Sequence, residues 1–443
     1  MSGKKDTALL EGPVRGTLIR FAVPIILSRV TTQLYTVADT MIVGRRLDAG
    51  ALAAVSNGST VLMLFLFVSG GFELGGGLLA AANRPRRDRE GMSRLTYNIL
   101  FVDLAAGLLM MVLGLWGMDW LLGAIRTPAE IRSGAALYGR IYLLGLPFLT
   151  LYDLSRELVI GCGESKLPLR AVTATSALNI ALDLALVGPM GVAGAALATA
   201  LSQAAGCAYM LRYLRRTLLA GRFRLRMLQR EWFVEIMRLS VPNTVQQSAG
   251  TAITVVRQSL LGPLGVAAIA GFSSAGKISL LLLMPVSSLM QSLVVFIAQN
   301  RAVGQLDRAE EGVREARRLL LCYTALVVAV CALGSRFLLG LFTRDQEAIL
   351  YGSLLLSREC WSYPLTNLRH LQEARLRGRQ QMGRFLASNM TLIAMSMAGC
   401  LLLVPRLGFP GFYWAVYISA PLGLALSTIL VRKGIGSTPA SIQ

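Results

Sequence analysis

Charged side chains are scarce in this sequence of 443 residues: they form 15% of it, against an apolar share of 54%. A soluble domain carries about a quarter charged residues, so this composition argues against a water-soluble fold. Mean hydropathy is +0.57. Apolar runs of roughly 20 residues, each long enough to cross ~30 Å of hydrocarbon as a helix, recur along the whole chain. The composition therefore indicates a multi-pass membrane protein.

Cysteine and histidine are also scarce, which argues against metal centres and disulfide frameworks. The six cysteines are scattered singly without a CxxC pair, and His370 is the only histidine. A zinc site, haem ligation and disulfides are therefore poorly supported, and we expect no cofactor. The sequence lacks a GxxxxGK[ST] phosphate-binding loop, so ATP is not the direct energy source. It also lacks HExxH and GxSxG, so an intramembrane enzyme has no support.

Acidic residues are few, at 24 against 44 Lys and Arg, and the net charge is +20. The basic residues gather in alternate short connections between apolar runs, around 84–89, 166–170, 212–230, 301–318 and 375–384. Cytoplasmic loops of membrane proteins carry such an excess, so the charge predicts topology rather than a nucleic-acid partner. We expect a cell-membrane protein with both termini cytoplasmic. The polar start has no signal-peptide pattern.

Twelve transmembrane helices are predicted, with Gly and Pro in the connections between them. They cover 17–43, 51–82, 95–118, 134–160, 168–187, 191–212, 234–260, 265–298, 317–340, 348–371, 384–404 and 409–431. The domains expected are a cytoplasmic segment 1–16, a first six-helix bundle 17–215, a basic cytoplasmic linker 216–233, a second six-helix bundle 234–431 and a cytoplasmic tail 432–443. The fold class is therefore an all-α polytopic membrane protein.

The two halves repeat each other. LIRFAVPIILSRV at 18–30 lines up with IMRLSVPNTVQQS at 236–248, which places Pro24 opposite Pro242, and the same offset places Gly44 opposite Gly262. Two six-helix halves of one orientation predict a pseudo-two-fold axis along the membrane normal, with a cavity between the halves. Pro24 and Pro242 are predicted helix kinks, because proline removes an internal hydrogen bond.

Four polar residues are predicted to lie at one depth in the outer half of the first bundle: Asp39, Asn179, Asp183 and Thr199. Asn179 lies one helical turn from Asp183, so their side chains share a face. Ionisable groups inside a membrane are costly and usually functional. Mutual repulsion of two carboxylates favours uptake of a proton, whereas oxygen ligands suit a hard cation such as Na⁺. Helix-to-helix hydrogen bonding is the alternative, above all for Asn179 and Thr199.

The acidic residues of this predicted site are confined to the first half. Asp39 aligns with Arg257. Aligning Asn179 with Asn389 places Asp183 opposite Ile393. We therefore expect the coupling ion to bind in the first bundle only.

Three segments together resemble the multidrug and toxic compound extrusion (MATE) family over about 15–432. They are YTVADTMIVG with its ALAAVS continuation, NIALDLALVG followed by GVAGAALATALSQ, and FIAQNRAVGQLDRA. The resemblance implies an antiporter that exports amphipathic, often cationic, compounds in exchange for H⁺ or Na⁺. It also implies that Asp39 is the coupling carboxylate of the first helix, and that Asn179, Asp183 and Thr199 form the cation site of the first bundle.

Candidate residues for the substrate cavity are Tyr35, Glu73, Arg257 and Met284. Glu73 is either a counter-ion for a substrate or a structural partner of a basic residue, and Arg257 has the same two roles open. Met284 suits either an adaptable binding surface or plain packing. Basic side chains near the expected cavity, including Lys277, argue against a purely cationic substrate.

The function predicted is secondary antiport of a small amphipathic molecule by alternating access. The alternative is a flippase for a lipid-linked or anionic substrate, for which the cavity arginines would bind pyrophosphate. A passive ion pathway is a third possibility. The expected partners are the substrate, the coupling cation and membrane lipid, and we expect a monomer.

Overall fold

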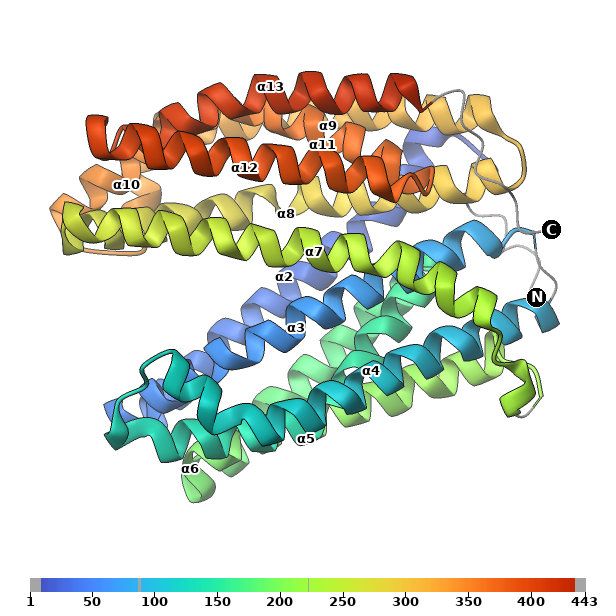
Figure 1. Ribbon diagram of the computed structural model, residues 1–443, viewed down its shortest axis with the longest axis horizontal. Coiled ribbons are helices and arrows are strands. Elements are labelled where there is room, and N and C mark those ends of the chain that lie inside the picture. Colours follow the sequence, from blue (N-terminus) through green and yellow to red (C-terminus); the bar gives the residue numbers. More distant parts are fainter. Residues whose placement is uncertain (1–8, 87–88, 222, 435–443) are drawn as a thin grey trace. The chain divides into compact units, whose positions relative to one another are not determined.

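A computed structural model describes residues 9–86, 89–221 and 223–434, which fold into helices without a strand (Figure 1). This confirms the all-α class. The first helices are α2 (Val14–Arg46), α3 (Ala49–Asn83), α4 (Arg89–Ala124), α5 (Ala129–Gly161) and α6 (Lys166–Thr217). They are followed by α7 (Arg230–Leu261), α8 (Val266–Ala302), α9 (Leu306–Gly340), α10 (Gln346–Glu359), α11 (Tyr363–Gly378), α12 (Met382–Leu407) and α13 (Gly411–Lys433). Short 3₁₀ turns lie between some of these helices: η1 (Leu225–Met227), η2 (Gly262–Leu264) and η3 (Cys360–Ser362).

Nine helices of the described chain are long and apolar enough to cross a membrane. One of them, α6, is 52 residues long and contains two predicted spans. The remaining predicted spans are α7, whose interior carries polar residues such as Gln247 and Arg257, and the shorter pair α10 and α11. The chain is thus a multi-pass membrane protein.

A tight hairpin at Gly191 divides α6. Gly191 has φ 58° and ψ −133°, which is left-handed backbone that favours glycine. A Cβ atom added at Gly194 would lie 2.2 Å from the carbonyl oxygen of Leu186. Residues eight apart in a straight helix are about 12 Å apart along its axis, so the chain folds back on itself. The two predicted helices 168–187 and 191–212 are the two sides of this hairpin, α6a before Gly191 and α6b after it.

The second half contains the same hairpin. Gly408, between α12 and α13, has φ 67° and ψ −144°. A Cβ atom added at Gly411 would lie 2.6 Å from the Cα of Val404. The four glycines therefore show which residues of the two halves correspond here: Gly191 corresponds to Gly408, and Gly194 to Gly411.

The predicted helix 348–371 is helical but is interrupted by one 3₁₀ turn. The chain forms α10, one 3₁₀ turn at η3, and then α11. Pro364 explains the break: it lacks an N–H, and its ring clashes with the carbonyl of the residue four positions earlier, Cys360. Pro364 lies in the first turn of α11, where proline is tolerated.

Two compact units make up the fold, and each buries its own apolar core. The first covers Val23–Thr244 of the described chain, and the second combines Leu9–Ala22 with residues 245–434. The division falls inside α2 and α7, beside Pro24 and Pro242. The predicted end segments 1–16 and 432–443 lie partly outside the described residues.

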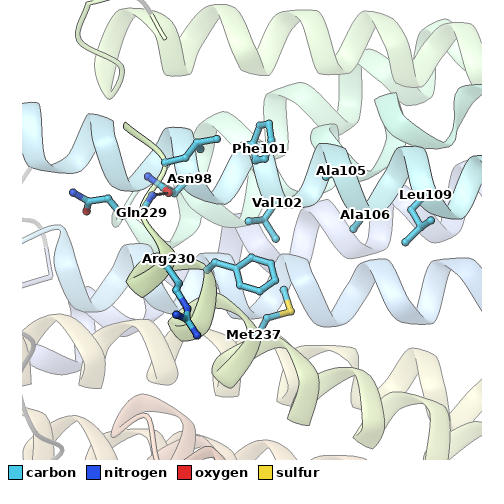
Figure 2. A pocket seen from close by; sticks show the side chains of 11 residues that line it. Asn98, Phe101, Val102, Ala105, Ala106, Leu109, Gln229, Arg230 and Met237 are labelled. Atoms are coloured by element: carbon cyan, nitrogen blue, oxygen red, sulfur yellow. Dashed lines mark hydrogen bonds between the residues drawn. The ribbon is translucent and has the colours of Figure 1, made fainter. Parts of the chain in front are cut away.

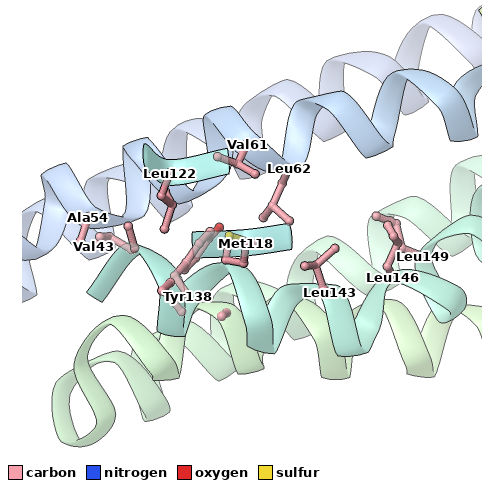
Figure 3. Packing of buried hydrophobic residues seen from close by; sticks show 14 of the residues in the cluster. Val43, Ala54, Val61, Leu62, Met118, Leu122, Tyr138, Leu143, Leu146 and Leu149 are labelled. Carbon is pink, nitrogen blue, oxygen red and sulfur yellow. The ribbon is translucent and has the colours of Figure 1, made fainter. Parts of the chain in front are cut away.

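The core of the first unit packs α3 against α5, with contributions from α2, α4 and α6 (Figure 3). Leu62 of α3 and Leu143 of α5 are almost fully buried within it. The core of the second unit is built from α8, α9, α10, α12 and α13, and includes Leu339 and Cys400.

Candidate functional site

Asp39 of α2 and Asp183 of α6a lie together in the first unit. Their carboxyl groups lie close enough to interact electrostatically. Asp183 is fully buried, with 0% of its surface exposed, while Asp39 is half-buried. The structure therefore brings together the two acids that the sequence singled out.

Asn179 lies one turn from Asp183 and is also buried, with 2% of its surface exposed. Both oxygens of Asp183 accept no hydrogen bond from the described residues, and the Asn179 amide neither accepts nor donates one among them. Buried polar groups are nearly always hydrogen-bonded, and each exception needs an explanation. An oxygen-rich group of this kind fits a proton or a hard cation such as Na⁺.

Thr199, the fourth predicted site residue, lies on α6b and is half-buried. Its hydroxyl donates to the carbonyl of Ala195 at 3.2 Å, a bond within its own helix. No hydrogen bond to Asp39 or Asp183 is found within the described part of the chain. The structure thus places Asp39 near Asp183, with Asn179 one helical turn along α6a, and places Thr199 on the adjoining side of the hairpin.

Three tyrosines lie within electrostatic reach of the acids, namely Tyr35, Tyr138 and Tyr142. Tyr35 precedes Asp39 by one turn of α2 and interacts with it. Tyr138 of α5 interacts with both Asp39 and Asp183, and Ser59 donates to its phenol oxygen at 3.4 Å. The sequence did not single out Tyr138, because a tyrosine in an apolar helix carries no sign of its neighbours.

A row of hydroxyl groups runs along α2 from Pro24 toward Asp39. Ser28 donates to the Pro24 carbonyl at 2.9 Å. Thr32, Thr36 and Thr40 each donate in the same way to the carbonyl four residues earlier. Such bonds compete with the helix's own ladder and often bend it. The row therefore softens the helix between its proline and its carboxylate.

A second set of charges in the first unit surrounds Glu73 of α3. Ser69 donates to Oε1 of Glu73 at 2.7 Å. Asp153 and Arg156 of α5 form an ion pair within electrostatic reach of Glu73. The opposite charges of Asp153 and Arg156 thus neutralise each other locally. Arg156 also stacks over the ring of Tyr152, with its Cζ 5.5 Å from the ring centroid.

The hairpin glycines correct the predicted alignment of the acid site with the second unit. Gly408 and Gly411 lie 217 positions after Gly191 and Gly194. The same register places Ser396 at the position of Asn179, and Cys400 at the position of Asp183. The burial agrees, since Ser396 is 6% exposed and Cys400 0%. The predicted pairs Asn179–Asn389 and Asp183–Ile393 are therefore wrong by two helical turns.

Arg257 of α7, the counterpart of Asp39, contacts this corner of the second unit. Its Nη2 donates to Oγ of Ser396 at 3.2 Å, and it lies within electrostatic reach of Glu359. We call these equivalent positions the corner of each unit: Asp39, Asn179 and Asp183 in the first, and Arg257, Ser396 and Cys400 in the second. The corner thus holds two acids in the first unit, and an arginine with a hydroxyl partner in the second.

Asn389 belongs to a different cluster of the second unit. Its Nδ2 donates to Oε1 of Glu373 at 3.0 Å. Glu373 also pairs with Arg369 and, through Oε2, with Nδ1 of His370 at 3.2 Å. Arg369 and Glu373 are buried, so their mutual pairing offsets the cost of removing both charges from water.

The remaining candidates lie on α8. Met284 is buried, with 7% of its surface exposed, and Lys277 is exposed. No group of three or more His, Cys, Asp or Glu side chains suited to a metal is found in residues 9–86, 89–221 and 223–434. A Na⁺ site would therefore need the amide or hydroxyl oxygens that accompany the acids.

Two bundles of membrane-spanning helices with buried, partly unpaired acids define a membrane transporter rather than an enzyme. Comparison with known families specifies the class. A model of the MatE family matches residues 24–185 and again residues 242–401. The chain belongs to the MatE family, which confirms the resemblance read from the sequence. The two matches begin at Pro24 and Pro242, the residues that the internal repeat places opposite each other.

The chain is similar to several known proteins. It is 26% identical over 357 residues to a probable multidrug resistance protein, YoeA, of Bacillus subtilis, covering 78% of this chain and 77% of that one. It is 24% identical over 362 residues to a FAD transporter of Shewanella oneidensis, covering 78% of each. A solved outward-facing multidrug resistance MATE transporter superposes with a TM-score of 0.90 over the whole of both chains, at 22% identity. Such MATE structures consist of two six-helix bundles.

Proposed function

We propose that the protein is a secondary antiporter that exports amphipathic organic compounds in exchange for H⁺ or Na⁺. The observation that carries the proposal is the electrostatic interaction of the Asp39 and Asp183 carboxyl groups, together with the unpaired buried atoms of Asp183 and Asn179. The similarity to a multidrug resistance protein of Bacillus subtilis supports the substrate class.

Coupling follows from the cost of holding two carboxylates together in a membrane. With both ionised they repel each other, and a bound proton or Na⁺ removes that repulsion. The ion therefore favours the arrangement in which α2 brings Asp39 against α6a. Without the ion, α2 favours an arrangement in which the acids separate. We assign the substrate to the second arrangement, so ion and substrate exclude each other.

Pro24 and the hydroxyl row of α2 supply the element that moves. The division between the two units falls beside Pro24, and the row extends from it to Thr40 next to Asp39. Bending at Pro24 would therefore displace Asp39 relative to Asp183. A Pro24→Ala variant should lose export or alter its ion dependence, and unchanged transport with unchanged ion dependence would contradict this role.

Sidedness follows from the basic connections. We propose that these connections, and both termini, face the cytoplasm, because cytoplasmic loops carry the excess of Arg and Lys. Asp39 and Asp183 then lie in the outer half of the membrane, where an inward ion gradient loads them first.

Export of a fluorescent organic cation from proteoliposomes, with pH and Na⁺ gradients imposed separately, tests the proposal. Export driven by one gradient and lost in Asp39→Asn and Asp183→Asn is the expected result. Asp119→Asn is the matched control, because Asp119 is an exposed acid of the same unit that pairs with Arg140. Export that needs neither gradient, or equal loss in all three variants, would overturn the antiport mechanism.

An anionic substrate is the second candidate. Arg257 keeps a buried Nε without a hydrogen bond among the described residues, and Lys277 is exposed on α8. The FAD transporter similar to this chain has a substrate by name that carries a pyrophosphate. Competition between the fluorescent cation and a nucleotide such as FAD decides between the two. Inhibition that disappears in Arg257→Gln would favour the anionic substrate.

A further inference from the structure

A groove in the first unit lies between α4 and the beginning of α7 and has a volume of about 410 Å³ (Figure 2). Along α4 it is lined by Phe101, Ala105 and Leu109, and along α7 by Phe233 and Met237. Phe101, Leu109 and Phe233 are exposed, at 42%, 60% and 50%. The groove is thus an open, apolar surface on membrane-spanning helices, and it contains none of the predicted ion-site residues.

One end of the groove is held in place by the linker between the bundles. Nδ2 of Asn98 donates to the carbonyl of Met227 at 2.8 Å, and the backbone N–H of Gln229 donates to Oδ1 of Asn98 at 2.9 Å. Phe223 also packs on the rings of Tyr97 and Phe101. Asn98 is 2% exposed, so these bonds are shielded from solvent. The linker is therefore docked on α4, and the end of the groove has a defined position.

This fixed end carries the only charge among the residues that line the groove. Arg230 is exposed and forms no hydrogen bond or ion pair within the described residues. It closes a stretch of sequence, 212–230, that contains seven arginines and no acidic residue. Basic clusters next to a transmembrane helix attract anionic lipid headgroups.

The length of the groove matches one leaflet. From Asn98 to Leu109 it follows α4 for about 16 Å at 1.5 Å per residue. Half of a ~30 Å hydrocarbon core is about 15 Å. An apolar groove of that length with one cationic end is complementary to a single anionic phospholipid, with the phosphate at the cationic end and an acyl chain along the apolar part.

We propose that this groove binds an anionic phospholipid of the surrounding membrane. One acyl chain lies along α4 against Phe101, Ala105 and Leu109, and the phosphate contacts Arg230. Bound lipid fills the space between the docked linker and α7, and so holds the linker in its place. This site is independent of the transport mechanism proposed above.

A second groove provides the matched comparison. It lies on α9 in the second unit, has a volume of about 470 Å³, and is lined by apolar residues and glycine, including Ala329 and Leu333. No charged residue lines it. It should admit acyl chains without preference for a headgroup.

Native mass spectrometry of the purified full chain, with phosphatidylglycerol and phosphatidylcholine of identical acyl chains, tests the proposal. Wild type should retain phosphatidylglycerol preferentially. Arg230→Gln should lower this preference about fivefold, the change expected for one surface charge. Ala105→Trp should fill the groove and remove the retained lipid. The matched controls are Arg314→Gln, an exposed arginine of α9, and Ala329→Trp in the uncharged groove.

Each outcome of this experiment either supports or contradicts the lipid site. Loss in Arg230→Gln and Ala105→Trp, with retention in both controls, supports the site. Equal retention of the two lipids by wild type, or equal loss in variants and controls, identifies ordinary boundary lipid and overturns the proposal. Displacement of the lipid by inorganic phosphate alone would show a phosphate site without an acyl-chain groove. The elution profile in size-exclusion chromatography verifies that each variant is folded.

Discussion

The two units place different chemistry at the same corner of the same fold. In the first, α2 and α6a bring Asp39 to Asp183, beside Asn179. In the second, α7 and α12 bring Arg257 to Ser396, with Cys400 in the position of Asp183. The first corner leaves buried oxygens without donors, while the second satisfies its hydroxyl with a guanidinium.

The difference separates scaffold from function. The hairpin glycines keep the same φ, ψ and close contacts in both units, so the backbone geometry is repeated. The charges are not repeated. A site whose geometry were needed only for packing would have no reason to differ in this way. We therefore propose that ion coupling belongs to the first unit, and we expect the second to contribute a fixed positive charge.

Removing the carboxylate of Asp39 should have the largest effect. Asp39→Asn should reduce gradient-driven export by roughly 5- to 150-fold, the range of a coupling free energy of about 1–3 kcal/mol. Export from proteoliposomes measures it. Arg257→Gln, at the equivalent position, should change substrate affinity and keep the ion dependence. A reversed result, with ion dependence lost only in Arg257→Gln, would place the ion in the second unit.

The repeated hairpins should respond equally to substitution. Gly191→Ala and Gly408→Ala should each lower the free energy of unfolding by about 1–3 kcal/mol, because alanine is strained at these positive φ values. A new Cβ meets no atom within 4 Å at either position, so conformational strain is the only cost. Thermal unfolding in detergent is the measurement. A clear loss of unfolding free energy at one glycine and none at the other would contradict the correspondence of the two hairpins.

A double-mutant cycle should show that Asp39 and Asp183 act together. If they share one ion, Asp39→Asn with Asp183→Asn should reduce export no further than either single change. The coupling between them would then be about 0.5–3 kcal/mol. Losses that simply add would mean that the two acids act at separate steps.

The smallest effect should come from the hydroxyl partner of Arg257. Ser396→Ala removes one interhelical hydrogen bond, and such bonds in membranes contribute about 0.6 kcal/mol on average. Thermal unfolding should record that loss, while ion-driven export should remain at the wild-type level. Loss of export in Ser396→Ala would give the second corner a role in coupling.

The sequence was sufficient for the helices and for the two acids. Apolar runs located eleven of the predicted spans, and the cost of a carboxylate in a membrane singled out Asp39 and Asp183. The prediction from sequence missed the 3₁₀ turn that interrupts the span 348–371. The break before α11 depends on Pro364, whose ring affects a residue one turn away. Apolarity alone gave no reason to end the helix there.

The second failure concerns register. Aligning Asn179 with Asn389 matched two identical residues, although Asn389 donates a hydrogen bond to Glu373 in a different cluster. The glycines at 191 and 408 carry the true register, because their backbone angles allow few other residues. The neighbours of Tyr138 and the docking of the linker on Asn98 depend on contacts between distant segments. No pattern within one segment reports them.

Ion binding to the purified protein tests the central claim most directly. Protons or Na⁺ released when substrate is added in detergent can be measured with a pH indicator or by isothermal titration calorimetry at varied Na⁺. The account predicts release from wild type and from Arg257→Gln, and none from Asp183→Asn. Release that persists in Asp183→Asn and is lost in Arg257→Gln would contradict it.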